Sequence, residues 1–249
     1  MRRSLRVILL GAVAFVIALI IVFPAGWLRG ALPAGTQCAS WSGSLWRGQC
    51  IGLTWSAPGK PPVQLDSLSW QVHPLRLLRA RLALDAELRG AGIQASGKIV
   101  LGTGNLLHVE DLSATGMLDR KLLGSLPSGW KARLEARAIT IELQGRALRQ
   151  LAGTVTAREL TDAQGARLGD YQLQFAPQAS APFTGNLRDL GGSIALAAQL
   201  IIKADRSWVL DGTASLRPGS PPQLARLLDQ FNTADLSGRR RILLEGVVD

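Results

Sequence analysis

Histidine, carboxylate, serine and cysteine side chains are the residues of this 249-residue chain whose types could support catalysis or metal binding. The chain has two histidines, His73 and His108, and only His108 lies in a compact cluster with carboxylates, Glu110 and Asp111. A metal site usually requires further ligands, and no second cluster supplies them. We therefore interpret the cluster as a solvated turn, and we expect both histidines to cap or flank strands.

Nucleophile and phosphate-binding motifs are equally weak. Ser44 and Ser67 lack the GxSxG context of a nucleophile elbow. Residues 102–104, Gly-Thr-Gly, lack the GK[ST] ending of a phosphate-binding loop. The basic run 239–241 has no interleaved aromatic residues, so a solvated strand start explains it better than RNA binding. The sequence predicts a protein that is not an enzyme and that has no catalytic residue, no cofactor, no metal and no nucleic-acid partner.

Two cysteines, Cys38 and Cys50, are the only ones in the chain. No histidine lies near them and their spacing is not that of a CxxC motif, which argues against a metal site and a redox motif. In an oxidising compartment they could form a structural disulfide, whose short loop stabilises a fold by about 3 kcal/mol in the chain-entropy model. Two free buried thiols are the alternative.

The element that must position the rest of the chain is the apolar stretch 7–28. As a helix it would reach about 33 Å, at about 1.5 Å per residue, against a hydrocarbon core of about 30 Å. A cleaved signal peptide is the competing interpretation, but its apolar run is usually shorter. Phe23 and Leu32 also occupy positions that should be small before a cleavage site. We expect an uncleaved transmembrane helix.

Charged residues set the orientation of that helix. Arg2, Arg3 and Arg6 precede it and only Arg29 follows closely, so the positive-inside rule places the N-terminus in the cytoplasm and the later residues across the membrane. Trp27 would then lie at the far membrane interface.

The formal charge of +10 is concentrated near the predicted helix. Residues 1–65 contain six basic and no acidic side chains, so residues 66–249 carry 22 basic and 18 acidic ones, a net charge of +4. This distribution suits anionic lipid headgroups better than DNA. An arginine-leaning composition with no partner at all explains it as well.

Period-two alternation of apolar side chains predicts antiparallel strands through most of the remaining chain. It is clear in residues 68–72, 82–88 and 93–101. Residues 75–81, LRLLRAR, predict a short helical turn between the first two of these strands. About 220 residues follow the anchor, enough for one large all-β domain or two smaller ones.

The second half repeats this order of elements at an offset of about a hundred residues. Helical spacing predicts short helices at 118–126 and 221–231. The apolar phase of residues 133–143 changes near Ala138, which predicts a β-bulge there.

The expected fold is mainly β: a single N-terminal transmembrane helix and a curved antiparallel β-meander with two short helices, built from an internally duplicated unit. The expected segments are a cytoplasmic tail (1–6), a transmembrane helix (7–28), a linker (29–40) and two periplasmic β repeats (41–145 and 146–249).

Several sequence blocks together carry a family resemblance. They are the charged N-terminus, the anchor with its FPAGWL exit, GSLWRG, LSWQVHPLRLLRARLALDAELRG and LGDYQL, in this order. Each is weak alone, but their order and spacing resemble type II secretion system protein N of Gram-negative bacteria over essentially the whole chain. The resemblance implies a bitopic inner-membrane protein with a periplasmic domain, serving an assembly that exports folded proteins across the outer membrane. The cysteine pair is not part of the family pattern.

Three non-enzymatic roles follow as hypotheses. The periplasmic domain could dock other inner-membrane subunits of the secretion machinery through strand edges or its tryptophan-rich segment. It could instead form a groove that holds lipid or another apolar ligand, because inward leucines and alanines leave space that aromatic rings would fill. It could also be purely structural and act on the abundance of its neighbours. The residues assigned to the partner surface, or alternatively to the core, are Trp41, Trp46, Trp55 and Trp70.

Overall fold

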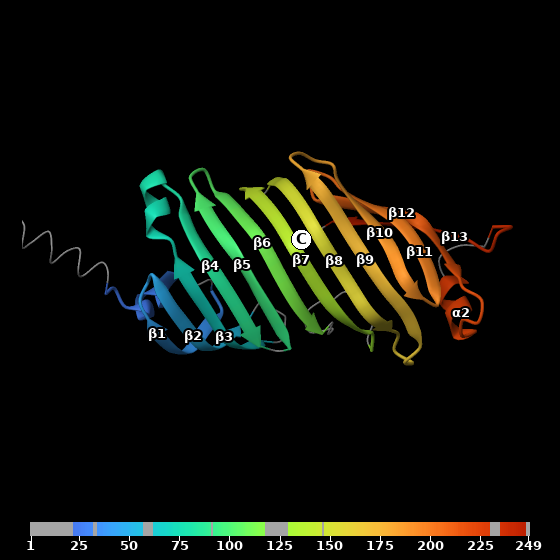
Figure 1. The fold of residues 1–249 in the computed structure, drawn as a ribbon, viewed down its shortest axis with the longest axis horizontal. Helices are drawn as coiled ribbons and strands as arrows, with labels where there is room; N and C mark the ends of the chain where they lie inside the picture. The colour runs from blue at the N-terminus through green and yellow to red at the C-terminus, as the bar shows by residue number, and fades with distance from the viewer. Residues whose placement is uncertain are drawn as a thin grey trace, which may run out of the picture. The chain divides into compact units, whose positions relative to one another are not determined.

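The computed structural model describes residues 22–31, 34–56, 62–90, 92–117, 129–145, 147–229 and 235–247. The chain divides into two compact units, residues 1–91 and 92–249. The described elements are η1 (Ala25–Ala31), β1 (Thr36–Gly43), β2 (Arg47–Trp55), β3 (Val63–Val72), η2 (Pro74–Arg79), β4 (Leu82–Gly90), β5 (Ile93–Gly102), β6 (Leu106–Met117), β7 (Lys131–Gln144), β8 (Ala147–Thr161), β9 (Arg167–Gln178), β10 (Phe183–Gly192), β11 (Ile194–Ile202), β12 (Ser207–Leu216), α2 (Gln223–Asp229) and β13 (Arg240–Val247). Figure 1 labels the strands and α2.

Where the structure describes the first unit, four antiparallel strands, β1 to β4, lie in chain order. The turn from β1 to β2 is tight: Gly43 has a φ of +86°, and a Cβ there would collide with the backbone of Arg47. Only glycine tolerates both conditions. A 3₁₀ helix, η2, joins β3 to β4 and confirms the predicted helical turn.

The predicted transmembrane helix falls mostly on residues 1–21, which lie outside the described residues. Its last residues behave differently from the prediction. Pro24 forms a β-bridge with Ser44, and Ala25–Ala31 form a 3₁₀ helix. Within the ranges described, no helix is both long and apolar enough to span a bilayer.

The predicted linker 29–40 is also not a linker throughout. Its residues from Thr36 onward belong to β1 and pair with β2, from Thr36 opposite Trp55 to Gly43 opposite Gly48. Small and polar side chains hide this strand in the sequence, because they give it no apolar alternation.

The described residues of the second unit form nine antiparallel strands, β5 to β13, each beside its neighbour in chain order (Figure 1). The mainly β, antiparallel meander is therefore confirmed. The bulge predicted near Ala138 is confirmed as well: Ala138 has a φ of +50°, and the β7–β8 register shifts between Arg137 and Thr140. The internal duplication stays a prediction.

Strands β6 (LLHVEDLSATGM) and β10 (FTGNLRDLGG) were not predicted. Their apolar residues alternate only in part, and the two sequences contain Gly, Asn and Asp, which are rare in strands. The helix predicted at 221–231 is confirmed as the shorter α2. The helix predicted at 118–126 lies outside the described residues.

A candidate apolar binding face

One face of the second unit is apolar from strand to strand. The register places Leu173 opposite Leu187 and Leu200 opposite Leu210. Leu210 in turn lies opposite Leu244 of β13. Directly opposed residues project to the same side of an antiparallel sheet. These leucines therefore form a continuous strip across β9 to β13.

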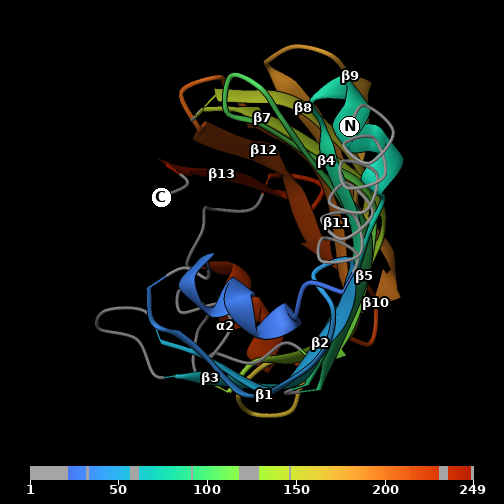
Figure 2. The same ribbon diagram turned by 90° about the vertical axis from the view of Figure 1, so that its left-hand side faces the viewer.

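Helix α2 covers one end of this face. Leu224 and Leu228 of α2 are 0% and 2% exposed, and they pack against Leu168, Tyr171 and Ile194. Figure 2, a view at 90° to Figure 1, shows α2 and the strands β12 and β13 of the same unit. The helix converts this end of the apolar face into a closed core, whereas the strip beyond it is only partly buried.

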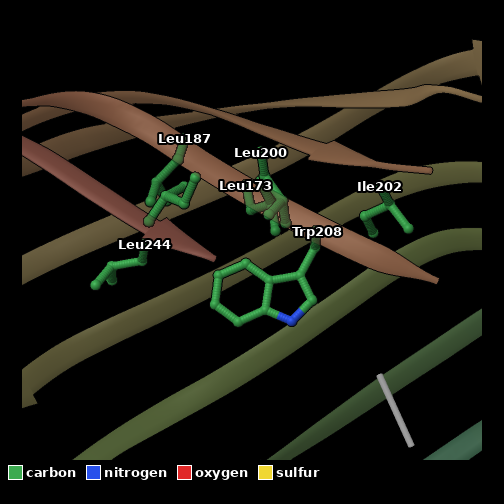
Figure 3. Close-up of a pocket in the computed structure, with 7 residues that line it drawn as sticks. Leu173, Leu187, Leu200, Ile202, Trp208 and Leu244 are labelled. Atoms are coloured by element: carbon green, nitrogen blue, oxygen red, sulfur yellow. The ribbon is translucent and has the colours of Figure 1, made fainter. Parts of the chain in front are cut away.

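The uncovered part of the face contains a pocket of about 370 Å³. Figure 3 shows its side chains gathered on one side of the strands. The lining residues are Leu173, Leu187, Leu200, Ile202, Trp208, Leu210 and Leu244. None of these side chains carries a charge, and the only polar group among them is the indole N–H. Such a surface can bind an apolar ligand by burial alone, but it offers no group for acid–base or nucleophilic chemistry.

Trp208 forms one wall of the pocket. Gly246 lies opposite it on β13, and a Cβ at Gly246 would come within 2.8 Å of the indole ring. The missing side chain therefore lets the ring approach the β13 backbone. Tyr171 of the same unit is 8% exposed and belongs to the core, whereas Trp208 lines an open pocket.

Tyr171 marks the boundary between the closed core and the pocket. Its hydroxyl donates to the Leu168 carbonyl at 3.0 Å. Burial, helped by the nearby Asp189 carboxylate, raises the pKa of Tyr171 to about 12. The phenol is therefore a neutral structural donor at physiological pH and not a proton-transfer group.

The titration of Tyr171 gives a testable pH dependence. Its folded-state pKa of about 12 lies above the ordinary value of 10.0, so folding favours the neutral phenol. Stability from this group is fully present below pH 10 and is lost as the pH rises from about 10 to about 12. We expect Tyr171→Phe to reduce this alkaline loss of melting temperature, measured by circular dichroism, at a cost near neutral pH of about 1 kcal/mol for the lost hydrogen bond. An unchanged alkaline profile would contradict this assignment.

The opposite face of the same strands is polar. Arg241 contacts Asp211 at 2.8 Å, and Arg188 donates to Gln172 at 2.6 Å. The Arg241 guanidinium holds the pKa of the Asp211 carboxyl below its usual range. These pairs lie on the residues that alternate with the leucines, so the sheet has one wettable and one apolar side.

The histidine cluster lies on strands, which corrects the predicted solvated turn. His108 is in β6, with Nε2 at 3.4 Å from Glu110 and Nδ1 at 3.2 Å from Glu142 of β7. Glu110 also contacts Lys98 at 3.6 Å. Sequence reasoning missed this because Glu142 becomes a neighbour only through strand pairing. No group of side chains suited to a metal ion occurs in the described part of the chain.

The tryptophans predicted for the partner surface or core lie in the first unit, but not all in one cluster. Trp41 and Trp70 meet edge to face with ring centres 6.0 Å apart. Trp46 lies in the turn before β2, and its carbonyl accepts a hydrogen bond from the Val72 N–H at 2.7 Å. Trp55, at the end of β2, is 46% exposed.

The predicted membrane-interface and cysteine residues are also in this unit. Cys38 and Cys50 form a disulfide between β1 and β2, with their Cα atoms 5.9 Å apart. Trp27 is 72% exposed and contacts Phe23, with ring centres 5.2 Å apart. Arg29, Cys38 and Trp41 share the lining of a second cavity of about 270 Å³ with Thr36 and Gln37. Arg2, Arg3 and Arg6 lie outside the described residues.

Comparison with known proteins gives one match. The family model described as "Type II secretion system (T2SS), protein N" matches residues 34–243 and therefore spans strands of both units. No curated protein and no solved structure matches the chain.

Proposed function

The chain belongs to the type II secretion system protein N family, which assigns it to type II secretion, and we propose that it is a non-enzymatic, single-pass inner-membrane component of that system. In this proposal its N-terminus is cytoplasmic and its β units are periplasmic, where they brace other inner-membrane subunits. The family match over residues 34–243 is the observation that carries the proposal. The apolar stretch 7–28 and its preceding arginines support the orientation.

Exposed apolar side chains of the first unit suggest where a partner subunit binds. Ile51 and Trp55, both on β2, are 48% and 46% exposed, and Leu75 of η2 is 79% exposed. Protein interfaces are enriched in large apolar and aromatic anchors of this kind. We therefore assign the docking surface to residues around β2.

A photo-crosslinking experiment in cells tests this docking surface. A photoreactive amino acid at Ile51 or Trp55 is expected to capture another inner-membrane subunit of the secretion system, whereas the same group at Leu53, which is 6% exposed on the same strand, is not. Trp55→Ala should weaken capture from position 51 by about tenfold or more, as expected for an interface anchor. Equal capture from all three positions, or none from any, would count against the proposal.

A deletion strain separates bracing from a mere effect on abundance. If the protein braces its neighbours, loss of the chain lowers secretion while the levels of the other subunits stay close to normal. If secretion falls only in proportion to those levels, the periplasmic domain acts through abundance, and the docking proposal is wrong.

The apolar face supports a second candidate function, a periplasmic groove that holds or transfers lipid. The supporting observation is the open pocket of about 370 Å³ lined by leucine, isoleucine and tryptophan. Concave sites lined mainly by apolar side chains are the usual form of a site for a small apolar ligand. Mass spectrometry of the gently extracted full chain is expected to show a bound lipid, and a lipid-free spectrum would exclude this function.

A further inference from the structure

The outer edge of β13 has no strand beside it in the described part of the sheet. β13 has one strand neighbour in the described sheet, β12, and their register runs without a shift from Ala214–Arg240 to Ser207–Val247. Its sequence, RRILLEGV, contains no proline. Sheet edges without proline or a bulge present unpaired backbone groups that can accept another strand.

The hydrogen-bond pattern identifies which backbone groups face this edge. The N–H of Lys203 donates to the Ser207 carbonyl, and the N–H of Arg217 donates to the Ser193 carbonyl. Hydrogen-bonded pairs alternate along an antiparallel ladder, so Asp211 bonds to β11 and not to β13. Leu243, which lies opposite Asp211, therefore directs its N–H and carbonyl outward.

By the same alternation, Arg241 and Glu245 also direct their backbone groups outward. Their side chains and that of Leu243 lie on the polar face, and Leu243 is 50% exposed there. Leu243 is therefore an exposed apolar side chain at the outer edge of the sheet, with an arginine and a glutamate two residues away on either side.

We propose that two copies of this chain pair through β13, antiparallel, about a two-fold axis at Leu243. Antiparallel pairing at this centre places Leu243 directly opposite Leu243 of the second copy, with outward backbone groups facing each other. It also places Arg241 of each copy opposite Glu245 of the other. Opposite charges in directly opposed positions stabilise a strand pair, and like charges destabilise it.

Charge selects this register over its neighbours. A centre two residues earlier would place Arg241 opposite Arg241, and a centre two residues later would place Glu245 opposite Glu245. Both alternatives bring like charges together, whereas the Leu243 centre makes two opposite-charge pairs and joins the two exposed leucines.

The pairing also extends the apolar face. Ile242 of one copy lies opposite Leu244 of the other, and Leu244 is 40% exposed and lines the pocket. A two-fold axis perpendicular to the sheet keeps both apolar faces on the same side. The dimer thus joins the two pockets along one surface.

Cysteine crosslinking of the full chain in membranes tests the register. Directly opposed residues of a hydrogen-bonded pair have Cα atoms about 5.5 Å apart, within the range of a disulfide. Leu243→Cys is therefore expected to form a covalent dimer on mild oxidation. Glu245→Cys is the matched control, because its two copies would lie four positions apart, about 13 Å, and should not crosslink. Crosslinking of Glu245→Cys without Leu243→Cys would overturn the register.

A proline substitution tests the dimer itself. Because the Leu243 N–H faces outward, Leu243→Pro removes no bond to β12 but blocks the new strand pair. Sedimentation of the detergent-solubilised full chain is expected to give twice the chain mass for the unmodified protein and for Leu243→Ala, and the single mass for Leu243→Pro.

Charge reversal gives a second variant should Leu243→Pro lose its native circular dichroism. Glu245→Arg places an arginine pair on each side of the axis and is expected to raise the dimer dissociation constant by about tenfold. A monomeric unmodified protein, a Leu243→Pro or Glu245→Arg chain that dimerises normally, or a different polypeptide recovered on β13 would each overturn the proposal.

Discussion

Replacing Trp70 by alanine is expected to lower the free energy of unfolding by about 3–5 kcal/mol, the range for truncating a packed tryptophan. The ring packs edge to face against Trp41 and lies against Gly48, where no side chain would fit. Its indole N–H donates to the Leu45 carbonyl at 3.0 Å. The substitution removes the ring packing against Trp41 and Gly48, and it leaves the Leu45 carbonyl without its donor. Chemical denaturation of the full chain, followed by circular dichroism, measures the change.

Two control variants separate the contributions of ring and hydrogen bond. Trp70→Phe keeps an aromatic ring against Trp41. It should lower the free energy of unfolding by about 1 kcal/mol or slightly more, because the N–H donor is missing. Trp55→Ala removes an indole that is 46% exposed, so it should change stability much less. If Trp70→Ala unfolds at the same denaturant concentration as the unmodified chain, the Trp41–Trp70 pair does not hold the first unit together.

Apolar alternation predicted much of the fold because it reports burial on one side of a strand. It identified the β class, the strands at 68–72, 82–88 and 93–101, and the bulge at Ala138, where a phase change in the sequence requires an inserted residue. These features depend on neighbours along the chain. They are therefore visible without knowledge of which strands pair.

Features that depend on pairing could not be predicted in the same way. β6 and β10 carry polar residues and glycines that interrupt the apolar alternation, so strand pairing and not the sequence pattern reveals them. Glu142 approaches His108 only because β7 pairs with β6. The pocket joins residues 173 and 244, and it exists only because four successive registers place their side chains on one face.

The same registers give strands β9 to β13 one polar face and one apolar face. Ion pairs such as Arg241–Asp211 keep one side of β9 to β13 in water, and the leucines between them are left for an apolar contact. Helix α2 covers part of this apolar face with Leu224 and Leu228. The rest of this face is the surface on which the proposed ligand would bind, so a substitution that changes only this face is the most direct functional test.

Leu200→Glu is the substitution with the largest expected effect on the proposed lipid site. Leu200 lines the pocket on β11, and a carboxylate there would have no cation among the lining residues. Burying an unpaired polar group beneath a ligand costs about 1–3 kcal/mol or more, and each 1.4 kcal/mol is a tenfold change in affinity. We expect the amount of lipid that copurifies with the full chain, measured by mass spectrometry, to fall at least about tenfold.

Ala197→Glu is the matched control for this loss. It lies three residues away on the same strand, is exposed on the opposite face, and is paired with Arg188, so it adds the same charge without entering the pocket. Lipid should copurify with Ala197→Glu as with the unmodified chain. If both variants lose lipid equally, net charge and not the apolar face controls binding; if neither does, the lipid lies elsewhere. Either result would exclude the pocket as the lipid site, whereas loss from Leu200→Glu alone would assign the ligand to this face.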